Sequence, residues 1–169
     1  MARVYSIPGS GEESVVRIME SGSSITDVLQ RLREAINRHD LDALAACFEP
    51  DYHSEFPAHP DRTFRGHEQM RKNWSQIFGA VPDIEAVLLR YASEEDTAWA
   101  EWEWTGTRSD GAPFATRGVT AQGVRQHRIA WVRLYREPVQ EGGGGAGEGV
   151  KQSLPGRQDR MSSPHIVPA

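Results

Sequence analysis

The sequence predicts one α+β domain in which helices come first and a sheet of antiparallel strands follows. Apolar residues recur at helical spacing in the first half of the chain, whereas after Pro82 apolar and polar residues alternate as they do in strands. The turn Ser109-Asp110-Gly111 contains the Asp-Gly pair that is typical of β-hairpins. Helices followed by hairpin-connected strands are expected to pack on one face of the sheet.

The chain has 169 residues, which is the length of one domain. Residues 23–139 contain all five tryptophans and every periodic segment, so we expect the folded domain there. Residues 1–22 are expected to form a flexible N-terminal extension. Residues 140–169 are rich in Gly, Pro, Ser and charge, and such a composition cannot bury enough apolar surface to offset its ordering entropy. We therefore expect a disordered Gly-rich tail.

Three helices are expected before Pro82. Ser24 can cap a first helix whose apolar residues continue at helical spacing through 25–36. Asp40 can cap a short second helix, which is expected to end near Pro50 because proline disfavours helix in the residue before it. The third helix is expected over residues 66–78. The expected strands are one short segment before this helix and four longer ones after it, namely 52–56, 84–91, 97–108, 113–124 and 128–137.

Charge and composition exclude several classes of function. The net charge of −5 and the pI near 5.7 argue against a nucleic-acid or anionic-membrane surface, which would need a basic stripe. Cys47 is the one cysteine, so neither an intramolecular disulfide nor a thiolate metal cluster can form. No apolar run has the length of a membrane span or of a signal-peptide core. We expect a cytoplasmic protein, and because no phosphate-binding or dinucleotide motif is present we expect no cofactor.

Four segments in the same order resemble a known family. The first two look like its N-x-x-D-x-D-A-L junction and its F-x-G-x-E helix entry, and the others look like its last three strands: Asn37-Arg38-His39-Asp40-Leu41-Asp42-Ala43-Leu44, Phe64-Arg65-Gly66-His67-Glu68, Trp104-Thr105-Gly106-Thr107, and Gly118-Val119 with Arg128-Ile129-Ala130-Trp131 and Tyr135. Over about residues 24–138 the chain therefore resembles the SnoaL-like polyketide cyclase group of the nuclear-transport-factor-2-like superfamily.

This resemblance implies a cone-shaped, strongly curved, mostly antiparallel sheet with about three helices on one side. It also implies a mostly apolar pocket at one end of the cone and a homodimer formed through sheet faces. The fold hosts isomerases, dehydratases, cyclases, epoxide hydrolases and non-catalytic modules, so it does not define a reaction. The catalytic sets of its steroid isomerases and epoxide hydrolases do not map onto this chain, because Phe56 precedes Pro57 and Leu134 stands where an aspartate is expected.

The strand at 99–105 offers a candidate acid–base pair. Alternation places Glu101 and Glu103 on one face, about 7 Å apart, and Trp102 and Trp104 on the other. If the glutamate face lines the cone, repulsion and desolvation should raise one carboxyl pKa and create a general base. The alternative is that both glutamates face water or pair with arginines across the sheet.

The last strand offers partners for such a base. Ile129, Trp131, Arg133 and Tyr135 share one face, whereas the apolar face of Ala130, Val132 and Leu134 indicates packing. Arg133 can hold a carboxylate or enolate, and Tyr135 can donate a hydrogen bond to a carbonyl. The alternative is an Arg133–Glu103 ion pair that orders the sheet.

The segment from His53 to Pro60 adds further candidates. His53 or Glu55 can act as a general base, and His53, Glu55 and His59 together suggest a metal site, although their spacing is not a known ligand pattern. Arg117 is a candidate partner for an anion. We expect no metal.

These observations give two hypotheses from different classes. The first is a cofactor-free isomerase, dehydratase, cyclase or hydratase acting on a small apolar carbonyl compound, and the second is a non-catalytic binding or protein-interaction module. An enzyme of this kind needs a desolvated carboxylate inside the cone, whereas a module leaves its carboxylates solvated or paired. The expected catalytic residues are Glu103, Glu55, Arg133 and Tyr135, and the expected substrate-binding residues are His53, Glu101, Trp131, Trp74 and Arg117.

Overall fold

The computed structural model describes residues 3–6, 22–140 and 145. The chain divides into two units, 1–139 and 140–169, and the architecture below is that of the first unit. The predicted tail, except Gln140 and Gly145, and most of the predicted N-terminal extension lie outside the described residues.

Three α-helices form in the described chain: α1 (Gly22–Asn37), α2 (Leu41–Ala46) and α3 (Gly66–Ala80). A 3-10 turn over Pro60–Arg62 precedes α3. As the sequence predicts, Asp40 caps α2, and its carboxylate accepts hydrogen bonds from the backbone N–H groups of Asp42 and Ala43 at 3.1 and 2.9 Å. None of the described helices has the length and apolar character needed to cross a bilayer.

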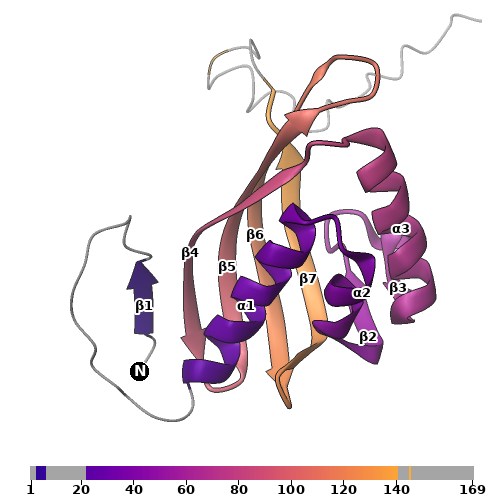
Figure 1. Ribbon diagram of the computed structural model, residues 1–169. Helices are drawn as coiled ribbons and strands as arrows, with labels where there is room; N and C mark the ends of the chain where they lie inside the picture. Colours follow the sequence, from indigo (N-terminus) through magenta and orange to yellow (C-terminus); the bar gives the residue numbers. More distant parts are fainter. Residues whose placement is uncertain (1–2, 7–21, 141–144, 146–169) are drawn as a thin grey trace, which may run out of the picture. The chain divides into compact units, whose positions relative to one another are not determined.

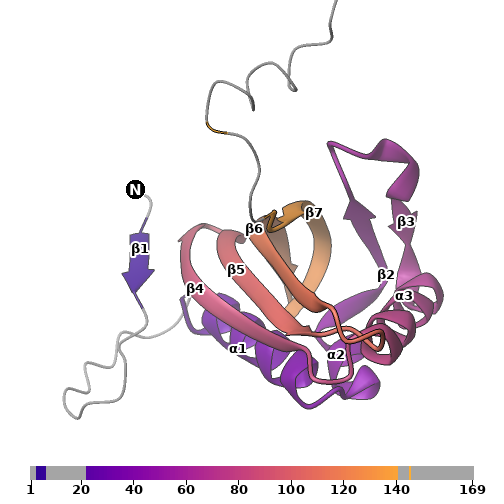
Figure 2. The same cartoon turned by 90° about the horizontal axis from the view of Figure 1, so that it is seen from above.

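The strands form one curved sheet whose order is β1-β4-β5-β6-β7-β2-β3. Parallel pairing occurs between β2 and β7, and the other neighbouring strands are antiparallel. Figure 1 shows the order of the elements, and Figure 2 shows β4 to β7 as a curved sheet with α1, α2 and α3 all on one side of it. This arrangement confirms the predicted fold class. The strands are β1 (Arg3–Ser6), β2 (Phe48–Glu55), β3 (Phe64–Arg65), β4 (Glu85–Glu94), β5 (Thr97–Thr107), β6 (Pro113–Arg125) and β7 (Arg128–Pro138).

The region around Pro50 differs from the prediction. The second helix ends at Ala46 instead of near Pro50, and β2 has already begun at Phe48. The pairing of β2 with β7 shifts register between Phe48 and His53, and Pro50 lies inside this irregularity. A proline cannot donate to a sheet ladder, so it is tolerated in the irregular stretch of a strand.

Asn37 attaches the end of α1 to the sheet. Its side-chain amide donates to the Ala86 carbonyl at 3.2 Å and accepts from the Ala86 N–H at 2.7 Å. His39, which follows in a left-handed conformation with φ 54°, contacts the Ile84 carbonyl at 3.2 Å. Asn37 and His39, at the junction between the first two helices, therefore fix the end of α1 over β4.

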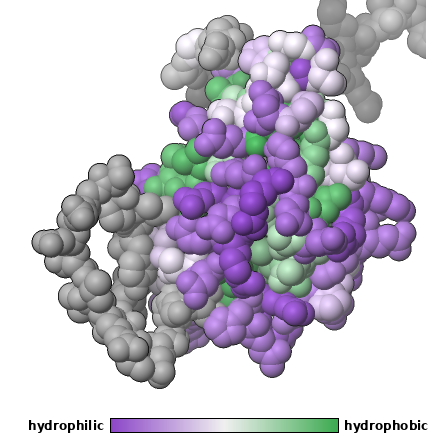
Figure 3. All heavy atoms as spheres, in the orientation of Figure 1, coloured by the Kyte–Doolittle hydropathy of each residue, from purple (hydrophilic) through white to green (hydrophobic). Residues whose placement is uncertain are grey.

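The core lies between the helices and the face of the sheet that they cover. Val28, Leu29 and Ile36 of α1 are fully buried there, and Trp102 of β5 retains only 2% of its exposure. The surface of the same unit is more polar than this core. The face drawn in Figure 3 is mainly hydrophilic, and its apolar side chains form small separate patches. The burial of one face by the helices is thus the main source of hydrophobic stabilisation.

The close approach at Gly106 gives a test of this packing. A Cβ at Gly106 would lie 2.5 Å from Val81 Cγ1 and 3.2 Å from the Ile84 Cα, whereas a Cβ at Gly79 in α3 would meet nothing within 4 Å. We expect Gly106→Ala to lower the free energy of unfolding by about 1–3 kcal/mol, because overpacking forces the backbone to move. Gly79→Ala, the matched control, should raise it by about 0.5–1 kcal/mol. Urea denaturation of both variants measures this, and equal effects would contradict the packing.

Candidate functional site

A cavity of about 130 Å³ lies between the covered face of the sheet and the helices α1 and α3. Most of its wall is aromatic or aliphatic, with Phe48, Tyr52, Trp74, Trp102 and Trp104 among the lining residues. The rings are in contact, since the centroids of Trp74 and Trp104 lie 5.1 Å apart and those of Phe48 and Tyr52 lie 4.5 Å apart. An apolar cavity with a few polar groups is the usual form of a small-molecule site.

The polar lining residues are uncharged with one exception, Arg136. The others are Ser54, Asn73, Thr120 and Gln122. Among the described residues, no Asp, Glu or His lines this cavity. Burial raises the pKa of the Tyr52 hydroxyl far above its ordinary value, so that group stays protonated. The site therefore has hydrogen-bonding groups but no group that takes up a proton near neutral pH.

A chain of hydrogen bonds orients Gln122. The Trp102 indole N–H donates to Thr120 Oγ1 at 3.0 Å, and the Thr120 hydroxyl donates to Gln122 Oε1 at 2.7 Å. Indole can only donate, so Thr120 must accept from it and its own hydrogen is left for the Gln122 carbonyl. The amide Nε2 of Gln122 is consequently turned away from Thr120, and it has no partner among the described residues.

Arg136 reaches the same cavity from the end of β7. Its guanidinium carbon lies 3.3 Å from the centroid of the Trp104 ring, and one terminal nitrogen contacts Thr116 Oγ1 at 3.5 Å. Burial lowers the pKa of Arg136 to about 10, so the group is still a cation at neutral pH. Its Nε is buried and has no hydrogen-bond partner among the described residues.

Three nitrogen donors of this lining are thus buried without a partner, on Trp104, Gln122 and Arg136. Buried polar groups are nearly always paired, and an unpaired one costs about 1–3 kcal/mol. All three belong to residues that line the same cavity.

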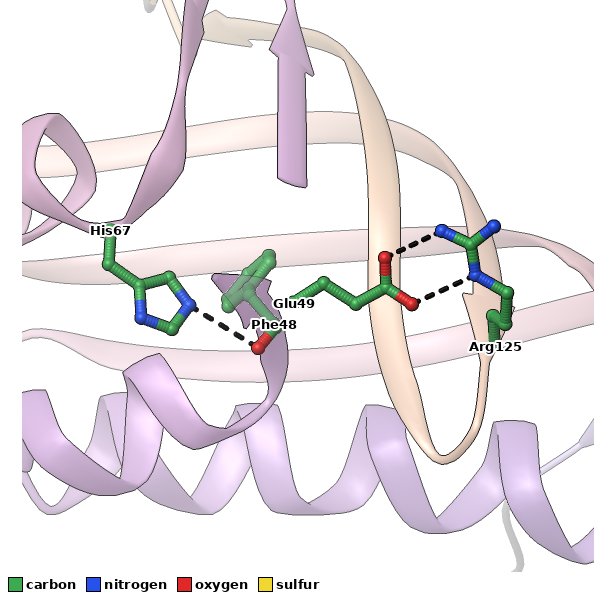
Figure 4. Close-up of polar contacts among 4 residues, drawn as sticks. All are labelled: Phe48, Glu49, His67 and Arg125. Atoms are coloured by element: carbon green, nitrogen blue, oxygen red, sulfur yellow. Dashed lines mark hydrogen bonds and ion pairs between the residues drawn. The ribbon is translucent and has the colours of Figure 1, made fainter. Parts of the chain in front are cut away.

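Two contacts hold the part of the wall formed by Phe48. The ring of His67 donates a hydrogen bond to the Phe48 carbonyl at 3.3 Å, and Glu49 pairs with Arg125 through two hydrogen bonds of 2.9 and 2.7 Å. Figure 4 shows these contacts on the two sides of the Phe48–Glu49 pair. The hydrogen bond from Arg125 also lowers the pKa of Glu49 below its ordinary range. The start of β2 is therefore tied both to α3 and to the β6–β7 hairpin.

Of the nine residues that the sequence nominates for the site, Trp74 alone lines this cavity. The strands alternate as predicted, but the covered face carries Trp102 and Trp104, so Glu101 and Glu103 lie on the opposite, outer face. There Glu101 pairs with Arg90 and Glu103 pairs with Arg117. These are the cross-sheet ion pairs considered as the alternative in the sequence analysis, although the partner of Glu103 is Arg117 instead of Arg133.

The remaining nominated residues also lie on the outer face, where β2 and β7 run in parallel. Arg133 donates to Glu55 at 2.7 Å, and this hydrogen bond lowers the pKa of Glu55, while His53 Nδ1 lies 3.2 Å from the same carboxylate. These three and Tyr135 surround an open depression. Trp131 lies on this face too, and the guanidinium carbon of Arg133 is 5.6 Å from the centroid of its ring. The structure therefore brings these side chains together, but outside the enclosed cavity. Alternation predicts Ile129 on the same face, but Ile129 is fully buried and lines the cavity, because the β6–β7 pairing shifts register between Ile129 and Trp131.

The three residues considered as a metal site in the sequence analysis, His53, Glu55 and His59, do not come together. His59 contacts Glu137 at 3.2 Å instead of approaching His53 and Glu55. Within the described part of the chain, no group of three or more His, Cys, Asp and Glu side chains is placed to hold a metal ion.

The comparisons with known proteins agree with this architecture. The SnoaL-like domain family matches residues 29–132. The chain belongs to the SnoaL-like domain family. Its resemblance to the nuclear-transport-factor-2-like superfamily is confirmed by the same match and by solved structures. A comparison with curated proteins found no match.

The solved structures similar to this SnoaL-like chain establish its fold. A putative SnoaL-like polyketide cyclase from Jannaschia has a TM-score of 0.62 and 17% identity, over 73% of this chain and 92% of the other. Wild-type IdmH, a putative polyketide cyclase from Streptomyces antibioticus, has a TM-score of 0.58 and 23% identity, over 67% and 90%. A protein with a ketosteroid isomerase-like fold from Catenulispora acidiphila, in complex with trimethylamine, has a TM-score of 0.58 and 18% identity, over 64% and 84%.

Sequence reasoning missed the polar residues of this SnoaL-like cavity, although one signal was present. The face of Ala130, Val132 and Leu134 indicates packing, and the next residue on that face is Arg136. A charged side chain on an otherwise apolar strand face is informative, because charged residues are seldom buried unless they are paired. Thr120 and Gln122 give a similar signal in β6, because both are polar residues that are buried on the covered face.

Removal of the Thr120 hydroxyl tests the hydrogen bonds that link Trp102, Thr120 and Gln122. We expect Thr120→Val to lower the free energy of unfolding by about 1–3 kcal/mol, because the buried indole N–H of Trp102 and the Gln122 carbonyl both lose their partner. Thr105→Val, on the outer face of the same sheet, is the matched control and should change stability little. Chemical denaturation compares the free energies of unfolding of the two variants. A Thr120→Val variant as stable as the control would contradict these hydrogen bonds.

Proposed function

We propose that this SnoaL-like protein binds a small, largely apolar molecule that bears a carbonyl or carboxyl acceptor, and that the ligand occupies the cavity beneath β5, β6 and β7. The observation that carries the proposal is the set of unpaired donors on Trp104, Gln122 and Arg136 within an apolar lining. A ligand that brings acceptors to these donors gains their hydrogen bonds and also the burial of its apolar surface.

The pairing of the carboxylates favours binding over carboxylate-based proton transfer. A general base for isomerisation, dehydration or cyclisation should stand desolvated inside the cone, with a raised pKa. Glu55 instead has a lowered pKa caused by the hydrogen bond from Arg133, and Glu103 pairs with Arg117 on the outer face. Among the described residues, the lining contains no carboxylate at all.

The enzymatic alternative rests on the same donors. Donors held in a dry cavity stabilise a developing oxyanion, as an enolate-forming isomerase or cyclase requires. Such an enzyme would still need a proton acceptor for the substrate carbon, and the candidate residues Glu103 and Glu55 are separated from the cavity by the sheet. A protein that binds an acidic or carbonyl ligand needs no such acceptor, and this makes binding the better-supported function.

The outer face of the sheet supports a homodimer as a second part of this proposal. Trp99, Val119 and Tyr135 are 43%, 37% and 50% exposed on it. Val119 and Tyr135 are directly opposite each other in the β6–β7 pairing, and Ala121 lies between Trp99 and Arg133 in the next row. Apolar groups flanked by ion pairs form the mixed surface that is typical of protein interfaces.

The ligand proposal can be tested by thermal-shift titration with single-ring ketones such as acetophenone and 2-cyclohexenone. An engineered cavity of about 150 Å³ holds benzene, so a cavity of about 130 Å³ takes no more than a single ring. At about 100 times its Kd, a ligand should add about 2.7 kcal/mol to the free energy of unfolding. Gln122→Met should weaken binding about fivefold or more because a donor is lost, whereas the exposed control Gln140→Met should bind as wild type. Equal binding by all three proteins would place the ligand elsewhere.

The dimer proposal can be tested by light scattering coupled to size-exclusion chromatography. We expect a wild-type dimer, and we expect Tyr135→Glu to shift it toward monomer because the new carboxylate would be desolvated at the interface. Gln69→Glu adds the same charge to an exposed position of α3 and should leave the dimer intact. A wild-type monomer, or dissociation of both variants alike, would count against this interface.

A further inference from the structure

We propose that the ligand of this cavity carries a carboxylate and that Arg136 is its anchor. This inference rests on the proposed function, because it assumes that the cavity binds a small molecule, and it adds the charge and the chemical class of that molecule. The class is a carboxylic acid with a single aromatic or alicyclic ring.

Arg136 pairs with no acidic side chain of the described residues, in contrast to four arginines on the outer face of the sheet. Arg90, Arg117, Arg125 and Arg133 each pair with a glutamate on the exposed side. Arg136 reaches the cavity instead, and burial is the single cause that lowers its pKa. A neighbouring carboxylate would have raised this pKa, so the cation is present and its charge is not neutralised by a described residue.

The placement of Arg136 suits recognition of a planar anion. Its guanidinium stacks on the face of Trp104 at 3.3 Å from the ring centroid, which holds the cation by a cation–π contact and restricts its plane. The N–H bonds of a guanidinium lie in that plane and form a fork that matches the two oxygens of a carboxylate. The Nε of Arg136 is buried without a partner in the described structure, so a carboxylate that displaces the adjoining lining would supply the acceptor that this prong lacks.

The other unpaired groups of the lining point to the same charge. Gln122 Nε2 and Trp104 Nε1 are both donors without acceptors. The hydrogen bond from Thr120 keeps the Gln122 carbonyl engaged, so the free end of this side chain donates. A cationic ligand would meet donors and a like charge here, whereas an anionic one meets donors and an opposite charge. A neutral ketone would satisfy one or two donors and leave the cation without a partner.

The size of the cavity limits the rest of the ligand. A volume of about 130 Å³ is slightly below the engineered cavity of about 150 Å³ that holds benzene. The aromatic walls of Trp74 and Trp104 suit the faces of a flat ring. The volume therefore admits no more than a single ring, and the carboxylate of a molecule such as benzoate or cyclohexanecarboxylate has to extend from this volume to Arg136.

The test compares an acid with its neutral isostere. Benzoate and benzamide have nearly the same shape, so their Kd values, measured by calorimetry on the full chain, differ through charge alone. We expect benzoate to bind at least about tenfold more tightly than benzamide, because a hydrogen bond to a charged group is the stronger one. Arg136→Met should remove this preference, and Arg136→Lys should keep part of it because the charge remains. Bound benzoate should also shift the indole N–H resonance of Trp104, assigned with Trp104→Phe.

A second measurement separates a binding role of Arg136 from a structural one. The burial that lowers the pKa of Arg136 destabilises the folded state at neutral pH, and the contact of its guanidinium with Trp104 offsets part of this cost, so Arg136→Met should melt close to wild type near pH 7. A marked fall in Tm would show that Arg136 serves the fold, and it would overturn the inference.

The outcomes also distinguish this inference from the proposed function. If benzamide and acetophenone bind as tightly as benzoate, and Arg136→Met has no effect on any of them, the cavity is a binding site but the ligand is not selected as an anion. If none of these probes binds to the wild-type protein, the proposed function fails and the inference fails with it.

Discussion

The two-residue period of the strands is the constraint on which the rest of this structure depends. Because successive side chains point to opposite faces, the same β5 strand buries Trp102 and Trp104 against the helices and exposes Glu101 and Glu103. The exposed face can then satisfy its charges by cross-strand pairing, as Glu103 does with Arg117. The covered face has to satisfy its polar groups among themselves or with a ligand. The cavity is where that requirement is not met by the described residues.

Long periodic segments could be predicted from the sequence because their pattern is local. The helix of Gly22–Asn37 and the strand of Thr97–Thr107 both follow the expected periodicity closely. The two-residue strand at Phe64–Arg65 could not be predicted, since it is defined by pairing with His53 and Ser54 in another strand. The parallel pairing of β2 with β7 joins segments about 80 residues apart and has no local signal either.

The face that lines the cavity could have been predicted from energies, although alternation alone left it open. A tryptophan buries up to about 250 Å² at about 25 cal/mol/Å², so turning Trp102 and Trp104 outward would forfeit several kcal/mol each. Turning Glu101 and Glu103 inward would add a desolvation cost of about several kcal/mol per carboxylate. Both terms favour the observed orientation. The unpaired state of Arg136 has no such signal, because it depends on which side chains neighbouring strands place beside it.

A cavity built from donors and a cation has a specific consequence for chemistry. It stabilises negative charge wherever that charge appears, whether on a bound carboxylate or on a developing enolate. Catalysis requires that the transition state be held more tightly than the ground state. A ligand that is already an anion is held fully in its ground state, and no described lining residue can take a proton from it. On the proposed function, the same donors that would assist a neutral carbonyl substrate favour simple retention of an acid, so the charge of the bound molecule decides between the two.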